Sequence, residues 1–345
     1  MSSRIAIHFR NHPKDRPMPT TVAIYERTVE RLRSRLETLA SDVVIVPFNK
    51  NGEYLVDGQV SAPEETAIDY LWLSHELSAE KIVGAALEMA LRTKSIDVMQ
   101  TFNAGLDLPA YKQVADKGVR ICNSNAQAVA ISEYVLANVL ACFHPLAQRQ
   151  QLQSEKAWEK TPFREIAGTN WLIVGFGPIG ENVASRARAF GASVSVIRRS
   201  PQPIEGVDRV GSLKDIEPFL ADADVIVLAC ALNDETRGMA NGRFFDAVKP
   251  GALLINIARG GIIDDAALFA ALDDGRISKA VLDVFNQEPL PAGDPYWEHP
   301  GVIVTAHTSF NGSGVRGRWD DLFFDNFPRY LNGEPLNNEV SPEKI

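Results

Sequence analysis

The chain has 345 residues, of which 45% are hydrophobic and 23% are charged. This length favours two domains, and the composition is close to the globular average, which excludes a disordered or low-complexity chain. Lysine and arginine number 35 against 44 aspartate and glutamate, for a net charge of −9. Because no long block of like charges occurs, neither nucleic acid nor an anionic membrane is expected as a partner.

The amino terminus, MSSRIAIHFR, has neither the apolar core of a signal peptide nor the Arg- and Ser-rich composition of a transit peptide. No apolar run approaches the roughly 18 residues that cross a bilayer, so a cytoplasmic location is expected. The three cysteines are widely spaced among apolar neighbours, which predicts reduced core thiols rather than disulfides or a zinc site. They are Cys122, Cys142 and Cys230. No bound metal is expected.

The first third of the chain alternates strands and helices. Strands are predicted at 4–9, 42–48, 68–74 and 95–102, and helices at 24–39 and 78–93. This alternation predicts a mostly parallel sheet with helices on its faces, in a smaller flavodoxin-like α/β domain. A long apolar-periodic helix is then predicted from 126 to about 150, with Ser124 or Asn125 as its N-cap. This helix should lead into a second domain.

The second part repeats the alternation more clearly. Apolar strands are predicted at 171–176, 193–197, 224–230, 252–258, 279–285 and 302–306. Six strands separated by helical stretches predict a doubly wound parallel sheet of the Rossmann type. A final helix is predicted at 317–333, and its apolar side should pack on the first domain.

The motif GFGPIG lies between the strand at 171–176 and a helical stretch. Its glycines have the GxGxxG spacing: Gly175 allows a tight turn, Gly177 lets the backbone approach a pyrophosphate, and Gly180 allows close contact between helix and strand. The N-terminus of the helix offers N–H groups to the phosphates. This context predicts dinucleotide binding by the whole motif, with Phe176, Pro178 and Ile179 between the glycines.

The end of the next strand decides which dinucleotide is expected. An acidic residue there would bind the ribose hydroxyls of NAD, but the chain has Arg198, Arg199 and Ser200. Two guanidiniums and a hydroxyl suit a 2′-phosphate, since charge-assisted hydrogen bonds to phosphate are strong. We therefore predict NADP(H) as the preferred cofactor, with NAD(H) possible. The alternative is that both arginines only solvate a loop.

Three charged or titratable residues each follow a predicted strand: Arg259, Glu288 and His307. The carboxyl ends of parallel strands meet at one edge of the sheet, where ligands bind. Taken singly, such a histidine is more often structural, and a glutamate before proline is more often a turn residue. Together beside a dinucleotide site, they predict a catalytic group.

Their chemistry suits the reduction of a 2-keto acid. The guanidinium of Arg259 can grip a carboxylate with two hydrogen bonds. A protonated His307 can deliver a proton to the carbonyl oxygen as hydride reaches the carbon. The carboxylate of Glu288 can favour the charged imidazole and orient it.

With these residues in place, the chain resembles the D-isomer-specific 2-hydroxyacid dehydrogenase family. The resemblance rests on GFGPIG, INIARGGIIDDAALFAAL, AVLDVFNQEPLP and VIVTAHTS, with NAGLD and ISEYVLANVL upstream. It covers residues from about 100 to 310. It implies that Arg259 binds substrate, that His307 is the acid/base and that Glu288 is its partner.

The resemblance also implies further contacts. Asp283 would face the nicotinamide amide, and Ala258 would belong to the cofactor site. The backbone at Asn103, Ala104 and Gly105 would receive the substrate carboxylate. These three and Arg259, together with Trp72 in DYLWLS, form the expected substrate-binding set.

Within the family, DYLWLS, the basic RRS and the order DVFNQEPLP then YWEHP are similar to the glyoxylate/hydroxypyruvate reductases. Two positions depart from the family pattern. Ala306 replaces the usual proline before the histidine, which leaves that turn less constrained. RRS lacks the common aspartate, which again favours NADP(H).

The family's domain order implies a substrate-binding domain at 1–123 and 309–345 and a dinucleotide-binding domain at 124–308, with an active-site cleft that closes by hinge motion. It also implies a homodimer paired through the cofactor domains. The helix at 126–150 and the segment 157–168 are the candidate arm.

The expected function is NADPH-dependent reduction of small 2-keto acids, of the glyoxylate/hydroxypyruvate class, to D-2-hydroxy acids. Two alternatives stay open. One is an NAD-linked dehydrogenase for a larger 2-hydroxy acid, such as 3-phosphoglycerate or a branched-chain acid. The other is a non-catalytic nucleotide-sensing protein that resembles the related transcriptional corepressors.

Overall fold

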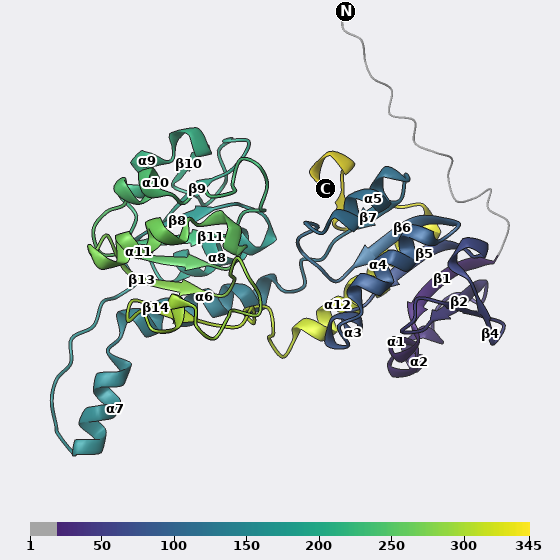
Figure 1. Cartoon of the computed structure of the whole chain (residues 1–345), viewed down its shortest axis with the longest axis horizontal. Helices are drawn as coiled ribbons and strands as arrows, with labels where there is room; N and C mark the ends of the chain where they lie inside the picture. Colours follow the sequence, from purple (N-terminus) through teal and green to yellow (C-terminus); the bar gives the residue numbers. More distant parts are fainter. Residues whose placement is uncertain (1–18) are drawn as a thin grey trace, which may run out of the picture. The chain divides into compact units, whose positions relative to one another are not determined.

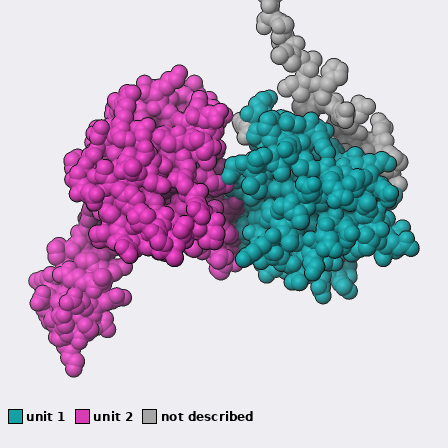
Figure 2. Space-filling model, viewed as in Figure 1, with its two compact units in different colours: residues 1–126, 316–345 teal, residues 127–315 magenta. Residues whose placement is uncertain are grey.

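The computed structural model describes residues 19–345. The chain divides into two compact units (Figure 2). Unit 1 comprises the residues up to Ala126 together with Arg316–Ile345, and unit 2 comprises Gln127–Val315. The sequence predicted these two boundaries after residues 123 and 308.

Unit 1 is built on an eight-stranded sheet in the order β15-β7-β6-β5-β1-β2-β3-β4. The strands are β1 (Thr20–Tyr25), β2 (Val43–Phe48), β3 (Tyr54–Val56), β4 (Gln59–Ser61), β5 (Ala67–Leu73), β6 (Ser95–Thr101), β7 (Arg120–Cys122) and β15 (Glu339–Val340). The strands from β7 to β2 in this order are parallel, and the edge strands β15, β3 and β4 pair antiparallel. The parallel part has the 2-1-3-4-5 order of flavodoxin-like folds, which confirms the predicted class.

Helices cover both faces of this sheet. They are α1 (Glu26–Arg31), α2 (Arg33–Leu36), α3 (Glu76–Ala79), α4 (Val83–Arg92), α5 (Pro109–Asp116) and α12 (Val315–Asn332), with short 3-10 helices η2 (Pro63–Glu65) and η6 (Pro342–Lys344). The first two helices and α12 pack on one face, and α3, α4 and α5 pack on the other. The predicted tail helix is α12, and it packs on unit 1 through Phe323 and Phe327, which are fully buried.

The helix predicted at 24–39 is wrong in its first residues. Residues 20–25, TTVAIY, form strand β1, and helical structure begins only at Glu26. The run is short and rich in β-branched residues, and periodicity alone does not separate a buried strand from a buried helix at that length. The strand predicted at 4–9 lies outside the described residues.

Unit 2 contains a seven-stranded parallel sheet in the order β10-β9-β8-β11-β12-β13-β14 (Figure 1). The strands are β8 (Asn170–Val174), β9 (Ser193–Ile197), β10 (Arg209–Gly211), β11 (Val225–Leu228), β12 (Ala252–Asn256), β13 (Ile277–Leu282) and β14 (Val302–Val304). Counted from β8 along the chain, this is the 3-2-1-4-5-6 order of a Rossmann sheet with one further strand, β14. The predicted doubly wound sheet is confirmed, and β10 is the strand that the sequence analysis missed.

The helices of unit 2 complete a three-layer arrangement. They are α6 (Ala128–Phe143), α7 (Leu146–Glu155), α8 (Pro178–Ala189), α9 (Glu217–Leu220), α10 (Gly242–Asp246) and α11 (Asp265–Asp273), with 3-10 helices η3 (Leu213–Asp215), η4 (Gly260–Ile262) and η5 (Pro295–Trp297). Residues of α6 and α8 pack on one face of the sheet, and residues of α9, α10 and α11 pack on the other.

The single helix predicted from 126 to about 150 is a pair of helices, α6 and α7, bent by 55°. Pro145 lies at the break. Proline has no N–H for a helical hydrogen bond, and its ring clashes with the preceding turn, so it interrupts the helix. The N-cap is Gln127 rather than Ser124 or Asn125. In Figure 1, α7 runs away from the rest of unit 2, and it has no buried residue.

Within residues 19–345, no helix by itself has the length and apolar composition that a membrane crossing requires. The bent pair α6 and α7 meets that requirement jointly, by length and composition only. The apolar residues of α6 lie in the core of unit 2, where they pack with Trp171 and Val183.

The central strands of unit 2 have continuous apolar sequences, and their burial explains this composition. Every residue of β11 and β12 is buried, because helices cover both faces of the sheet. All seven strands are parallel, so their carboxyl ends lie along one edge of the sheet, which we call the carboxyl edge. The candidate site is built on this edge.

Candidate active site on the carboxyl edge of unit 2

The glycine-rich loop follows β8, and two of its glycines have no room for a side chain. Gly175 has a φ of +100°, and a Cβ atom there would lie 2.6 Å from the backbone N and Cα of Cys230. A Cβ atom on Gly180 would lie 2.3 Å from the carbonyl oxygen of Gly175. The loop is therefore held against the segment that follows β11 and against the first turn of α8 by backbone contacts that only glycine permits.

The middle glycine leaves space where a phosphate could approach. Gly177 is the N-cap of α8, and no heavy atom lies within 4 Å of a Cβ atom built on it. Pro178 occupies the first helical position, Phe176 and Ile179 are half-buried, and Gly177 is exposed. Together, the open space at Gly177 and the N-terminus of a 12-residue helix fit the pyrophosphate of a dinucleotide.

The basic segment follows β9, the neighbour of β8 in the sheet. The backbone N–H of Arg198 donates to Gly211 O at 3.0 Å, while the side chain of Arg198 is half-buried and those of Arg199 and Ser200 are exposed. In the described part of the chain, no carboxylate forms an ion pair with either arginine. The segment can thus offer cations to an anionic group at this end of the carboxyl edge.

Arg259 lies three positions after β12, in a turn that a buried asparagine holds. Asn256 has no exposed surface; its Nδ2 donates to Arg259 O at 2.9 Å, and its Oδ1 accepts from the backbone N–H of Ala258 at 3.0 Å. The Nη1 of Arg259 donates to Ala258 O at 2.7 Å. Asn256 was not among the predicted site residues, although a polar residue at the end of an apolar run is a signal that the sequence offers.

The two glycines after Arg259 differ in how much space surrounds them. Neither has a φ in the left-handed region, and both lie in η4. A Cβ atom on Gly260 would lie 2.0 Å from the carbonyl carbon of Phe285 and 2.3 Å from the N of Asn286, whereas one on Gly261 would come no closer than 3.3 Å to Leu232. Gly260 therefore lets the Arg259 turn pack directly on the loop that leads to Glu288.

Glu288 and His307 follow β13 and β14, and the structure brings them into contact. His307 Nδ1 lies 2.8 Å from Glu288 Oε2, and the other oxygen, Oε1, accepts from the backbone N–H of Phe285 at 2.9 Å. An ionised carboxylate can only accept hydrogen bonds, so Nδ1 carries the proton. The outer ring atom, Nε2, is then the one that can exchange a proton with a substrate.

Asp283, at the end of β13, is fully buried. Its carboxylate accepts hydrogen bonds from Thr305 Oγ1 and from the backbone N–H groups of Thr308 and Ser309. The contact with a nicotinamide amide expected for Asp283 stays a prediction. What the structure adds is a carboxylate that binds the segment carrying His307.

The expected substrate-binding residues of unit 1 lie in two kinds of environment, the core and a loop. Trp72 is 2% exposed and stacks on Phe323 of α12, with ring centroids 4.0 Å apart. Trp72 was expected to contact substrate, but this core packing accounts for the residue without such a contact, because the ring has almost no free surface.

The loop after β6 carries the other three expected residues. Asn103 accepts from Ser124 N–H through its backbone oxygen at 2.8 Å, and Ala104 O accepts from Asn123 Nδ2 at 2.6 Å. The Oδ1 atom of Asn103 is buried without a partner in the described part of unit 1, and Gly105 is half-buried. Binding of a carboxylate by this loop stays a prediction.

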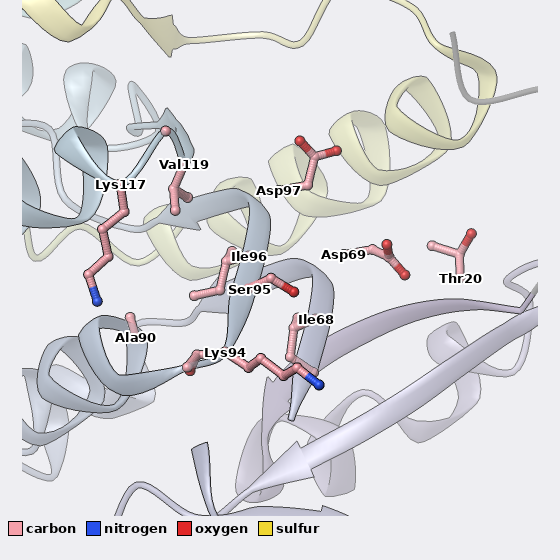
Figure 3. A pocket seen from close by; sticks show the side chains of 12 residues that line it. Thr20, Ile68, Asp69, Ala90, Lys94, Ser95, Ile96, Asp97, Lys117 and Val119 are labelled. Carbon is pink, nitrogen blue, oxygen red and sulfur yellow. The ribbon is translucent and has the colours of Figure 1, made fainter. Parts of the chain in front are cut away.

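Unit 1 also has a cavity of about 540 Å³ that none of the expected substrate-binding residues lines. Its lining includes Thr20, Ile68 and Ser95, which lie at the starts of β1, β5 and β6. Lys117 lines the side of the cavity across from Thr20 (Figure 3). The cavity is therefore at the amino ends of these strands, whereas the expected ligand residues follow carboxyl ends. Among residues 19–345, no three metal-ligating side chains gather at one place, and the absence of a metal stays a prediction.

Comparison with known proteins assigns the chain that carries this site to a family. Residues 136–309 match the model of the D-isomer specific 2-hydroxyacid dehydrogenase, NAD binding domain. The chain belongs to that family. The match covers the glycine-rich loop, the basic segment and all three residues of the predicted catalytic group.

Proteins with similar sequences or structures cover most of the chain. A glyoxylate/hydroxypyruvate reductase A of Serratia proteamaculans is 34% identical over 200 residues, 57% of this chain and 64% of that protein. A hydroxyphenylpyruvate reductase of Plectranthus scutellarioides is 29% identical over 74% of this chain and 82% of its own. A family member from Xanthobacter autotrophicus Py2, solved with NADPH and MES, is 27% identical and covers 95% of this chain and 99% of its own, with a TM-score of 0.74.

Proposed function

We propose that this dehydrogenase reduces small 2-keto acids of the glyoxylate/hydroxypyruvate class to D-2-hydroxy acids with NADPH. The observation that carries the proposal is the 2.8 Å contact between His307 and Glu288 on the edge that also holds the glycine-rich loop and Arg259. The name of the Serratia relative supports the substrate class, and the NADPH in the Xanthobacter structure supports the cofactor.

The chain's own residues divide the chemistry among them. A reduced nicotinamide, when bound, supplies the hydride that reaches the carbonyl carbon of the substrate. Arg259 binds the substrate carboxylate through its guanidinium. His307 donates the Nε2 proton to the carbonyl oxygen as negative charge develops there, and Glu288 stabilises the imidazolium and holds the ring plane.

For the cofactor, the proposal assigns the 2′-phosphate of NADP(H) to Arg198, Arg199 and Ser200, and the pyrophosphate to the loop at Gly177. A guanidinium at the end of β9 attracts a phosphate, where a carboxylate would repel it. NAD(H) binds the same loop without this interaction, so it is expected as the weaker cofactor. Ala258 and Asp283 complete the proposed cofactor set, near the nicotinamide.

We also propose a homodimer formed through unit 2. The segment from α7 to Ile166 exposes apolar surface: Trp158 is fully exposed, and Leu146 and Phe163 are about half exposed. Leu146 begins α7, a helix with no buried residue, and Trp158 and Phe163 lie in the segment that follows it. Large exposed apolar side chains that cluster at a surface are typical of an interface. Light scattering after gel filtration should give twice the chain mass, and a monomer would contradict the proposal. A cytoplasmic location stays a prediction.

A panel assay tests the function. NADPH oxidation is followed with glyoxylate, hydroxypyruvate, pyruvate, phenylpyruvate and 2-ketoisocaproate. The proposal expects the largest kcat/KM for the first two acids. Higher values for the bulky acids with NADH would favour the alternative dehydrogenase, and no oxidation with any acid would favour a nucleotide-sensing protein.

A further inference from the structure

The segment that carries His307 is held mainly by one buried residue, Asp283. Asp283 accepts from Thr305 Oγ1 at 2.6 Å, from Thr308 N–H at 2.8 Å and from Ser309 N–H at 2.9 Å through its carboxylate. Its backbone oxygen accepts from His307 N–H, also at 2.8 Å. Four hydrogen bonds from residues 305–309 therefore converge on Asp283.

The backbone of this segment needs such support. His307 has a φ of +46°, in the left-handed region that residues other than glycine rarely adopt. Its neighbour Ala306 is exposed and does not restrict the chain as a proline would. A residue stays in this region only when its surroundings hold it there. Here Asp283 accepts four hydrogen bonds from the segment, and Leu282 O accepts one more from Thr305 N–H at 3.0 Å.

Hydrogen bonds through Thr305 connect Asp283 to the helix α6. The hydroxyl of Tyr134 lies 2.7 Å from Thr305 Oγ1. Since the single hydrogen of Thr305 Oγ1 is donated to Asp283, Tyr134 must be the donor in this contact. Burial, with the nearby charge of Asp283, raises the pKa of Tyr134 to about 12, so the hydroxyl keeps its proton at neutral pH.

We propose that Tyr134 and Thr305 are positioning residues for His307 and act through Asp283. Tyr134 fixes the rotamer of Thr305, Thr305 fixes the carboxylate of Asp283, and the carboxylate fixes the turn that aims Nε2. Neither hydroxyl touches the reacting atoms. This inference rests on the proposed function, because it takes His307 as the proton donor.

The test compares four single variants and the double variant of Tyr134→Phe and Thr305→Val with the wild-type enzyme. Tyr134→Phe and Thr305→Val each remove one hydroxyl at nearly constant volume, and Thr305→Ser restores the hydroxyl. Tyr296→Phe is the matched control, because Tyr296 also lies in unit 2 and donates its hydroxyl to the side chain of another residue, the carboxylate of Asp265, at 2.8 Å. Kinetics are measured for the keto acid, and NADPH affinity is measured by fluorescence.

We expect Tyr134→Phe and Thr305→Val each to lower kcat by about tenfold, the effect of one lost hydrogen bond in the transition state. KM and NADPH affinity should change by less than about twofold, since ground-state contacts are intact. Thr305→Ser and Tyr296→Phe should keep the wild-type kcat. The double variant should be no slower than Thr305→Val, because both hydroxyls act along one path.

Amide hydrogen exchange in the peptide that contains residues 305–309 provides a readout that does not depend on activity. Faster exchange in Tyr134→Phe and Thr305→Val, but not in the control, is expected if the turn loosens. Unchanged kcat in both variants, or an equal loss in Tyr296→Phe, would overturn the inference. An inactive wild-type enzyme would instead overturn the proposed function, and the exchange data would still report on the turn.

Discussion

His307 Nδ1 and Glu288 Oε2 lie 2.8 Å apart, although the two side chains follow different strands, β14 and β13. The side chains are 40% and 36% exposed, and an ion pair so accessible to water adds little to the free energy of unfolding. The contact therefore matters for the orientation of the ring rather than for the stability of the fold.

Replacing His307 or Glu288 should lower the catalytic rate without lowering the stability of the fold. His307→Ala should lower kcat by roughly 10²–10⁴-fold, the usual contribution of a general acid, and Glu288→Gln by about tenfold, since an amide no longer stabilises the imidazolium. Steady-state kinetics measure both effects. NADPH binding and the thermal midpoint should be unchanged, and an active His307→Ala variant would place the proton donor elsewhere.

The guanidinium of Arg259 should be required for its shape as well as its charge. Arg259→Lys keeps the charge but loses the planar pair of donors, so we expect KM for the keto acid to rise and kcat/KM to fall by about 100-fold. The hydrogen bond to Ala258 O at 2.7 Å would also be lost. Wild-type kinetics in Arg259→Lys would show that another cation binds the carboxylate.

The basic segment can be tested with two cofactors in one variant. Arg198→Ala should raise KM for NADPH by about tenfold, the equivalent of one charge-assisted hydrogen bond. The kcat/KM for NADH should stay constant, because NADH has no 2′-phosphate, so NADH is the internal control. Equal losses with both cofactors would point instead to a distorted β9 loop.

Gly260 and Gly261 offer a matched pair of substitutions. Gly260→Ala would place a Cβ atom 2.0 Å from the backbone of Phe285, so the two loops must separate. We expect a loss of at least about 2 kcal/mol in the free energy of unfolding and loss of activity. Gly261→Ala meets only the tip of Leu232 at 3.3 Å and should be tolerated. Denaturant unfolding and kinetics of both variants make the comparison.

Asp224 links three parts of unit 2. Burial alone would raise the pKa of Asp224, but hydrogen bonds from Lys249 and the backbone N–H of Asn170, and the charge of Arg164, lower it below the ordinary value of 3.8. A lowered pKa in the folded state means that the carboxylate stabilises the fold above the unfolded pKa, and that this contribution is lost as pH falls through the folded value.

Asp224→Asn should accordingly reduce the free energy of unfolding by roughly 2 kcal/mol at pH 7. The difference from wild type should shrink as the pH falls below about 4, because the wild-type carboxylate then becomes protonated. Urea unfolding at a series of pH values measures this. A difference that does not vary with pH would show that the charge of Asp224 is not the cause.

Much of the architecture could be predicted because its signals are local. Fully buried strands such as β11 and β12 read as unbroken apolar runs, and the glycine spacing at 175–180 marks the turn into α8. The errors also have local causes. The run at 20–25 is too short to distinguish a strand from a helix by periodicity, and Pro145 divides a pattern that looked continuous.

The α/β class could be predicted from local patterns in the sequence, and so could the positions of Arg259, Glu288 and His307 after their strands. The contacts that hold these three residues become visible only in the folded chain. Thr305 meets Asp283 across 22 positions, and Tyr134 meets Thr305 across 171. The burial of Trp72 against Phe323 is equally non-local. Periodicity reports which residues share a face within one element, whereas hydrogen bonds and contacts between distant segments depend on how the elements pack.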